Sequence, residues 1–168
     1  MHTNHAAIPE KIFITGFIGS DRMSAGQKLS ETLGYPILVL DDMIEERDGR
    51  SLKKLIMMKG EHEYRNKEYE ILKEYSAKKG FIMVCGDGVV HDDMNLEILK
   101  NNPTLFVEEP LEILWSRVQN TESGLYAFLY DADKETAYEK FTAFYQLRLP
   151  LYRQCSNVNP TGLFVITE

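Results

Sequence analysis

The sequence predicts a three-layer α/β fold, in which a parallel β-sheet lies between two layers of helices. Short apolar runs rich in β-branched residues alternate along the chain with longer segments whose apolar residues recur at helical spacing. Two parallel strands need a crossover long enough to hold a helix, so this alternation favours a parallel sheet. Ligands of such folds bind beyond the carboxyl ends of the strands, and we expect the functional residues there.

Strands and helices are expected in strict alternation over most of the chain. The runs that predict strands, each too short and too rich in Ile, Val, Leu and Phe for an amphipathic helix, are Ile12–Thr15, Ile37–Leu40, Phe81–Cys85, Leu105–Val107 and Leu163–Ile166. The segments that predict helices are Met23–Leu33, Ser51–Met58, Glu61–Lys78, Asp92–Lys100, Leu111–Val118 and Lys134–Arg153. The stretch Gln119–Asp133 has neither pattern, and its length predicts a mobile lid.

The composition is typical of a single globular domain, expected to span residues 1–168. Hydrophobic residues make up 43% and charged residues 27% of the chain, which is enough apolar material for one sizeable core. The net charge of -7 argues against general affinity for nucleic acid or anionic membranes, because the long-range field repels both. A small anionic ligand would therefore need a local basic pocket.

The sequence also predicts a monomeric protein of the cytoplasm. No apolar run approaches the roughly 18 residues that a membrane span needs. Residues 1–9 lack the apolar stretch of a secretory signal, and we expect them to be a flexible leader. Cys85 and Cys155 lie far apart, without the spacing of a zinc site or a disulfide framework, which fits a reducing compartment.

The segment from Gly16 to Gly26 lies between the first expected strand and the first expected helix, which is the context of a phosphate-binding loop. The consensus of such loops is Gly-x-x-x-x-Gly-Lys-Ser/Thr. It provides backbone N–H groups around the phosphates, a lysine for the outer phosphates and a hydroxyl for magnesium. The last three positions are Asp21, Arg22 and Met23 here. From the residues alone, an ordinary strand-to-helix turn remains an alternative.

Each of these three substitutions weakens a phosphate site. Asp21 adds a carboxylate and a Cβ where phosphate oxygens and a crowded turn are expected, so it should repel phosphate. Arg22 keeps the positive charge but on a longer, planar group. The thioether of Met23 cannot hold magnesium, which takes oxygen ligands, and the hydroxyl of Ser24 lies one residue further along the helix.

Four further motifs follow the loop in order. They are Asp41-Asp42-Met43-Ile44-Glu45 with Gly49 and Ser51, Gly60-Glu61-His62-Glu63-Tyr64-Arg65 with Glu68, Gly86-Asp87-Gly88, and Arg148-Leu149-Pro150-Leu151-Tyr152. With these motifs the chain, from about Ile12 to Tyr152, resembles the shikimate kinases, small P-loop kinases that phosphorylate a hydroxyl of shikimate with ATP and magnesium. The resemblance implies a P-loop NTPase-like fold with a lid and a five-stranded parallel sheet in the order 2-3-1-4-5.

The resemblance also implies an acceptor site built from Asp41, Arg65, Gly86, Gly88 and Arg148. Asp41 would bind the acceptor hydroxyls and orient or deprotonate the attacking one. Arg65 and Arg148 would hold the carboxylate of shikimate or a similar acid, since a guanidinium can meet a carboxylate with two parallel hydrogen bonds. The turn at Gly86 and Gly88 would approach the ligand through its backbone.

Alternatives remain open at several of these positions. Without the other motifs, Arg65 would be read as a solvated arginine that pairs with Glu61 or Glu68 one helical turn away. A plain strand-to-helix turn is the alternative for the segment after the third strand. Asp87, which replaces a family glycine within it, would add a negative charge, bind a cation or select a different acceptor.

The nucleotide side is implied in the same way. Its positions are Gly16, Gly19, Ser20, Arg22, Ser24 and Arg117, with Arg22 in the place of the catalytic lysine. Arg117 would stack on adenine, with a solvated arginine at a helix end as the alternative. The family's magnesium positions are Met23 and Val39 here, so the metal site is undefined. Asp42 does not replace the lost aspartate, because adjacent residues of a strand point to opposite faces.

The departures from the family pattern are grouped on one side of the site. The acceptor residues are kept, whereas the loop is altered and the stretch Gln119–Asp133 lacks the arginine that neutralises the transferring phosphoryl group in the family. One hypothesis is an ATP- and magnesium-dependent shikimate kinase of aromatic amino-acid biosynthesis, impaired in catalysis. The second is a non-catalytic pseudokinase that binds shikimate or a related carboxylated polyol as a regulatory or scaffold protein. The third is an interaction module in which neither site works.

Overall fold

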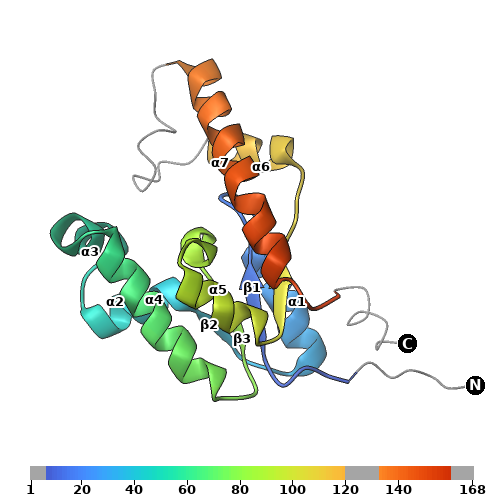
Figure 1. Cartoon of the computed structure of the whole chain (residues 1–168). Helices are drawn as coiled ribbons and strands as arrows, with labels where there is room; N and C mark the ends of the chain where they lie inside the picture. Colours follow the sequence, from blue (N-terminus) through green and yellow to red (C-terminus); the bar gives the residue numbers. More distant parts are fainter. Residues whose placement is uncertain (1–6, 120–132, 160–168) are drawn as a thin grey trace, which may run out of the picture.

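The computed structural model describes residues 7–119 and 133–159, and in this part of the chain a parallel sheet is flanked by helices (Figure 1). Its strands are β1 (Ile12–Thr15), β2 (Ile37–Val39), β3 (Ile82–Val84) and β4 (Thr104–Phe106). The order across the sheet is β2-β3-β1-β4, and every pairing is parallel. The fold class is therefore confirmed, and the order matches the first four strands of the predicted one.

Three of the predictions lie wholly or partly outside the described residues. These are the fifth strand at Leu163–Ile166, most of the predicted lid at 119–133 and the first part of the predicted leader at 1–9. A single domain over residues 1–168 and a monomeric state also stay predictions.

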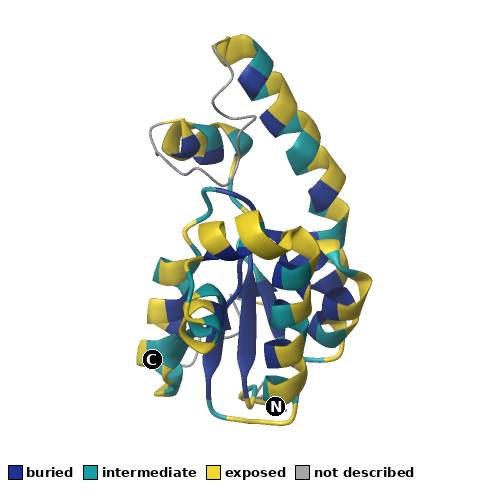
Figure 2. Cartoon of the chain, turned by 90° about the vertical axis from the view of Figure 1, so that its left-hand side faces the viewer, coloured by how far each residue is buried: buried dark blue, intermediate teal, exposed yellow. Residues whose placement is uncertain are grey.

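The alternation of side chains along β1 divides the core into two layers. Ile12 and Ile14 pack with Leu29 of helix α1 (Arg22–Leu33) on one face of the sheet. Phe13 belongs to the larger cluster on the other face. All four residues of β1 are buried, as expected for a central parallel strand with helices on both faces. The buried strands lie at the centre of the molecule in Figure 2.

The remaining helices lie mainly over the larger core. They are α2 (Leu40–Asp48), α3 (Leu52–Lys59), α4 (Glu61–Ser76), the 3₁₀ helix η1 (Asp87–His91), α5 (Asp93–Lys100), α6 (Leu111–Val118) and α7 (Lys134–Cys155). The first half of α7, together with α6, projects beyond the body that contains the sheet (Figure 1). None of the helices in the described ranges is long and apolar enough to cross a membrane.

Helix α2 corrects the sequence analysis, which extended a strand to Leu40 and expected no helix after it. The strand ends at Val39, and Leu40 already belongs to the helix. Asp41 and Asp42 lie in the first turn of α2, where the positive end of the helix dipole stabilises acidic side chains. Asp42 is exposed and does not replace the lost metal ligand, but the reason is the turn of a helix and not the alternation of a strand. The other predicted boundaries agree with the structure or differ from it by at most two residues.

Candidate functional site

Asp41 is a partly buried carboxylate directly after the carboxyl end of β2. The hydroxyl of Tyr64 on α4 donates to its Oδ1 at 2.5 Å. Burial raises the pKa of Asp41 above that of an ordinary aspartate. The Tyr64 hydrogen bond opposes this shift, nearby Asp87 adds to it, and the positive charge of Arg22 opposes it. A carboxylate fixed in this way can accept a hydrogen bond from an acceptor hydroxyl, and its raised pKa suits a group that exchanges a proton.

Arg65 is buried on α4 and points toward the turn after β3. Its Nη1 donates to Glu68 at 2.7 Å and its Nη2 donates to Glu61 at 3.0 Å. The alternative of a solvated arginine is therefore half right: both ion pairs exist, but the residue is only 8% exposed. Gly88 makes this position possible, because a Cβ there would lie 2.1 Å from Nη2 of Arg65.

Arg148 reaches the same place from α7. Its Nη1 donates to Oδ2 of Asp87 at 2.8 Å, and its guanidinium lies 4.1 Å from the centre of the Phe144 ring. The Tyr152 hydroxyl donates to the backbone carbonyl of Asp87 and so fixes the turn from the same helix. Asp87 therefore does not point away from the site but pairs with one of the two arginines that define it.

These side chains surround a cavity of about 260 Å³, hereafter the acceptor cavity, whose lining includes Asp41, Arg65, Asp87, Gly88 and Arg148. A second hollow of about 220 Å³, hereafter the loop hollow, also contains Asp41 in its wall. The structure thus brings together four of the five predicted acceptor residues. Gly86 lines the loop hollow instead, with its Cβ position 3.2 Å from both carboxylate oxygens of Asp41.

Asp21 is the N-cap of helix α1. Its Oδ1 accepts a hydrogen bond from the backbone N–H of Ser24 at 3.1 Å, and its Oδ2 accepts one from the Ser24 hydroxyl at 2.7 Å. The hydrogen bond from the Ser24 hydroxyl lowers the pKa of Asp21 most, and the one from the Ser24 backbone N–H lowers it further. The carboxylate is therefore charged at neutral pH. The backbone N–H and the hydroxyl of Ser24, which would face phosphate in a phosphate-binding loop, are therefore already hydrogen-bonded to a side chain of the protein.

We predict that Asp21→Ala lowers the free energy of unfolding by about 1 kcal/mol, the typical effect of losing an N-cap side chain. Chemical denaturation monitored by circular dichroism measures the change. Asp21→Asn is the matched control, because asparagine caps helices about as well as aspartate, and it should stay close to the wild type. Equal losses in the two variants would contradict the capping role.

A second carboxylate, from Glu109, also binds the loop. Its Oε2 accepts a hydrogen bond from the backbone N–H of Asp21 at 2.9 Å. Arg117 on α6 holds Glu109 with two hydrogen bonds, Nη1 to Oε2 at 2.7 Å and Nη2 to Oε1 at 2.9 Å, and its Nη1 also donates to the carbonyl of Gly19. Arg117 keeps 39% of its side chain exposed. Arg117 thus lies at the loop and pairs with a carboxylate near the surface, and its contact with adenine stays a prediction.

The other loop residues are held closely. Gly19 has φ of 86°, and a Cβ there would lie 2.9 Å from the Leu114 carbonyl, so only glycine fits. Gly16 faces Ser20, whose hydroxyl is buried and lacks a hydrogen-bond partner among the described residues. Arg22 points into the loop hollow, where its Nη1 donates to the Cys85 carbonyl at 2.8 Å.

The two positions that the family resemblance assigns to magnesium do not fit this ion. Met23 offers a thioether and is 40% exposed, and Val39 offers only alkyl carbons. The Ser24 hydroxyl donates to Asp21. Magnesium requires oxygen ligands in near-octahedral geometry, and neither Met23 nor Val39 supplies a side-chain oxygen.

Comparison with known proteins gives the family. A protein-family model described as shikimate kinase matches residues 19–161. The chain belongs to the shikimate kinase family. It is 32% identical to the shikimate kinase of Dehalococcoides mccartyi over 152 residues, which are 90% of this chain and 83% of that protein.

Other members of the family give the same result. The chain is 39% identical over 108 residues to the bifunctional shikimate kinase/3-dehydroquinate synthase of Thermotoga maritima. The match covers 64% of this chain and 22% of that protein, so the chain spans about a fifth of its length. The shikimate kinase from Acinetobacter baumannii, solved in complex with shikimate, superimposes with a TM-score of 0.79 at 23% identity, over 95% of this chain and 92% of that one. The fold is thus the α/β P-loop kinase fold of the shikimate kinases.

Sequence reasoning missed three contacts of this shikimate-kinase-like site. The hydroxyl of Tyr64, next to Arg65 in the sequence, was the signal that this residue could bind a neighbouring polar group. The partnership of Asp87 with Arg148 joins residues 61 positions apart. The contact of Glu109 with Asp21 joins residues 88 positions apart, and nothing in the sequence pattern marks it.

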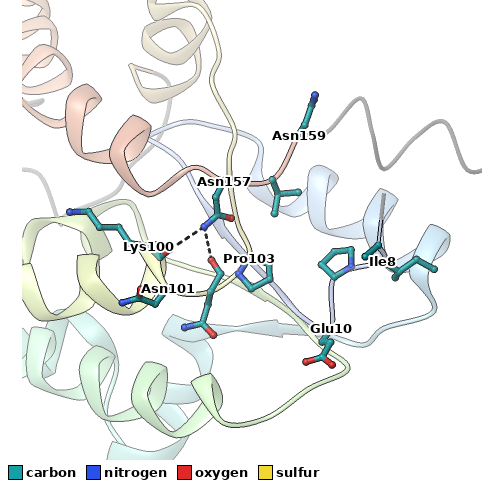
Figure 3. A pocket seen from close by; sticks show the side chains of 11 residues that line it. Ile8, Glu10, Lys100, Asn101, Pro103, Asn157 and Asn159 are labelled. Carbon is teal, nitrogen blue, oxygen red and sulfur yellow. Dashed lines mark hydrogen bonds between the residues drawn. The ribbon is translucent and has the colours of Figure 1, made fainter. Parts of the chain in front are cut away.

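A further cavity, of about 580 Å³, lies at the opposite end of the sheet (Figure 3). It is lined by residues just before β1, just before β4 and just after α7, where the side chain of Asn157 donates to the carbonyls of Lys100 at 3.3 Å and Asn102 at 2.9 Å. Because ligands of open α/β sheets bind at the carboxyl ends of the strands, we do not assign the family function to this cavity. None of the predicted site residues lines it.

Proposed function

We propose that this shikimate kinase family member binds a small polyol of the shikimate class in the acceptor cavity and does not transfer phosphoryl groups from ATP efficiently. The observation that carries the proposal is the position of Asp41. Its carboxylate lines both the acceptor cavity and the loop hollow, so a hydroxyl bound to it would face the altered phosphate loop. Binding without turnover suits a regulatory or scaffold protein.

The retained residues support the binding half of the proposal. Tyr64 fixes the carboxylate that would accept the ligand hydroxyl. Gly88 leaves room for the buried guanidinium of Arg65. The cavity is smaller than the roughly 300–1,000 Å³ typical of sites for drug-sized ligands, which favours a small metabolite.

The loop supports the catalytic half of the proposal. The charged carboxylates of Asp21 and Glu109 accept hydrogen bonds from backbone N–H groups of the loop that would otherwise donate to phosphate. Losing a single group that stabilises developing charge typically costs about 2.7 to 4 kcal/mol of transition-state stabilisation. The lysine, the magnesium hydroxyl and the lid arginine of the family are all replaced or missing in this sequence. We therefore expect turnover to be close to zero.

Substitution of Asp41 tests the binding half. Asp41→Ala should weaken polyol binding at least tenfold, because it removes the carboxylate that accepts the ligand hydroxyl. The measurement is isothermal titration calorimetry with shikimate and, separately, with its methyl ester. Asp42→Ala, an exposed aspartate in the same helical turn, is the matched control and should bind as the wild type does. Flat traces for both probes with the wild-type protein would contradict the proposal.

A functional ATP:shikimate phosphotransferase is the second candidate. Arg22 favours it, because this residue keeps a positive charge in the loop hollow that Asp41 also lines. The test is a coupled assay of ADP release with ATP, magnesium and shikimate present. We expect a rate equal to that of the blank without protein. Shikimate-dependent ADP release above the blank would support the second candidate and contradict the first.

A further inference from the structure

The acceptor cavity carries more negative than positive groups. The acidic and basic side chains in its wall are Asp41, Glu61, Asp87, Arg65 and Arg148. Glu68 lies behind Arg65, fully buried, and adds a further carboxyl group. A cavity meant to attract a carboxylate would be expected to show the opposite balance.

Both arginines already have carboxylate partners within the chain. Arg65 donates to Glu68 and Glu61 through its two Nη atoms. Arg148 donates to Asp87, and this ion pair is largely shielded, with side-chain exposures of 6% and 16%. The carboxylate that the family resemblance assigns to the ligand is thus supplied by Asp87.

A ligand carboxylate would meet an electrostatic penalty at this position. It would have to displace Asp87 from Arg148 or lie against it as a like charge, and the repulsion is strong where solvent is largely excluded. The Asp87 side chain cannot move freely toward solvent, because the Tyr152 hydroxyl binds its backbone carbonyl and Arg148 binds its carboxylate. An uncharged group meets no such penalty.

We propose that Asp87 determines the acceptor class, and that the cavity takes a polyol without a carboxylate at the position next to Arg148. The inference rests on the proposed function, since it requires a ligand at Asp41. It goes further by excluding shikimate itself as the preferred ligand. A neutral polyol is expected to bind.

Calorimetric titration of shikimate and of its uncharged methyl ester tests this directly in the wild-type protein. We expect the ester to bind at least tenfold more tightly than shikimate. Tighter binding of shikimate, or equal binding of the two, would overturn the inference while leaving the proposed function in place. Failure of both probes to bind would overturn both.

Asp87→Asn removes the charge with little change of size and provides the second test. This variant should reverse the preference, with shikimate gaining at least tenfold over its affinity for the wild type. Asp93→Asn, an exposed aspartate close by in sequence, is the matched control and should keep the wild-type preference. An unchanged preference in Asp87→Asn would contradict the role of Asp87.

The melting temperature provides a third test, which does not need a tightly binding ligand. Asp87→Asn leaves the buried guanidinium of Arg148 without its carboxylate, so its melting temperature should fall. Free acetate should then raise the melting temperature of Asp87→Asn, but not that of the wild type or of Asp93→Asn. No selective effect of acetate would show that the position next to Arg148 does not accept a carboxylate once Asp87 is neutralised, and would overturn the inference.

Discussion

Phe17→Ala is expected to lower the free energy of unfolding by about 3–5 kcal/mol, the range for a buried phenylalanine truncated to alanine. Phe17 belongs to the phosphate loop, is 1% exposed and packs against four rings of α7. The centroid distances are 5.2 Å to Phe141, 5.7 Å to Phe144, 5.1 Å to Tyr145 and 6.4 Å to Tyr152. The substitution therefore removes both apolar burial and the contact that joins the loop to α7.

Equilibrium denaturation in urea measures this loss. Leu147→Ala is the control on the same helix, because Leu147 is 72% exposed, and it should change the free energy of unfolding by no more than about 0.5 kcal/mol. A loss for Phe17→Ala as small as that of the control would mean that the loop and α7 do not pack in solution as described.

The stability of the wild type should fall, relative to that of Glu68→Gln, as the pH rises from about 4.5 to about 7. Burial raises the pKa of Glu68 from an ordinary 4.5 to about 7, against the opposing effect of Arg65. The folded state therefore holds this proton more tightly than the unfolded state, and deprotonation above the unfolded pKa favours unfolding. A shift of this size corresponds to about 3 kcal/mol, and the Glu68→Gln variant would not show it because its amide does not titrate.

Denaturation curves of both proteins at a series of pH values give the difference. Glu74→Gln is the control, because the contribution of Glu74 to stability should depend on pH in the opposite direction. Hydrogen bonds from Arg47 and then Lys78 lower the pKa of Glu74 to about 2, so its contribution is present above pH 4.5 and is lost as the pH falls toward 2. Parallel curves for the wild type and Glu68→Gln between pH 4.5 and 8 would contradict the prediction.

Much of the fold could be predicted because its signals are local. The apolar runs of β1 and β3 are buried on both faces, and such runs are visible without knowledge of the partner strands. Helix α2 was missed although Leu40, Met43 and Ile44 have helical spacing, because the segment is short and Val39 offers no side-chain cap. The motif after β2 was therefore placed correctly in the sequence but on the wrong kind of element.

The residues that line the acceptor cavity could be identified from the sequence more readily than their contacts, and their roles stay predictions. Matching motifs identified Asp41, Arg65, Gly88 and Arg148, which line one cavity. Asp41 and Gly88 follow neighbouring parallel strands, whose carboxyl ends lie at one edge of the sheet, whereas Arg65 and Arg148 reach the cavity from α4 and α7. The partners of these groups come from distant segments and depend on side-chain geometry, so Glu109 could not be assigned. The cap at Asp21 was missed as well, although aspartate directly before a helix is a local signal that favours capping.

The cap at Asp21 also bears on how this loop could change over time. In a loop that binds phosphate, the ligand completes the end of the helix, whereas α1 is completed here by its own side chain. A first reversion at this position would lose the cap before the lysine and hydroxyl needed for phosphate were in place. Stability and phosphate affinity thus oppose each other at one residue. A return to glycine at position 21 would exchange a small loss of helix capping for an amide and a hydroxyl that phosphate could reach.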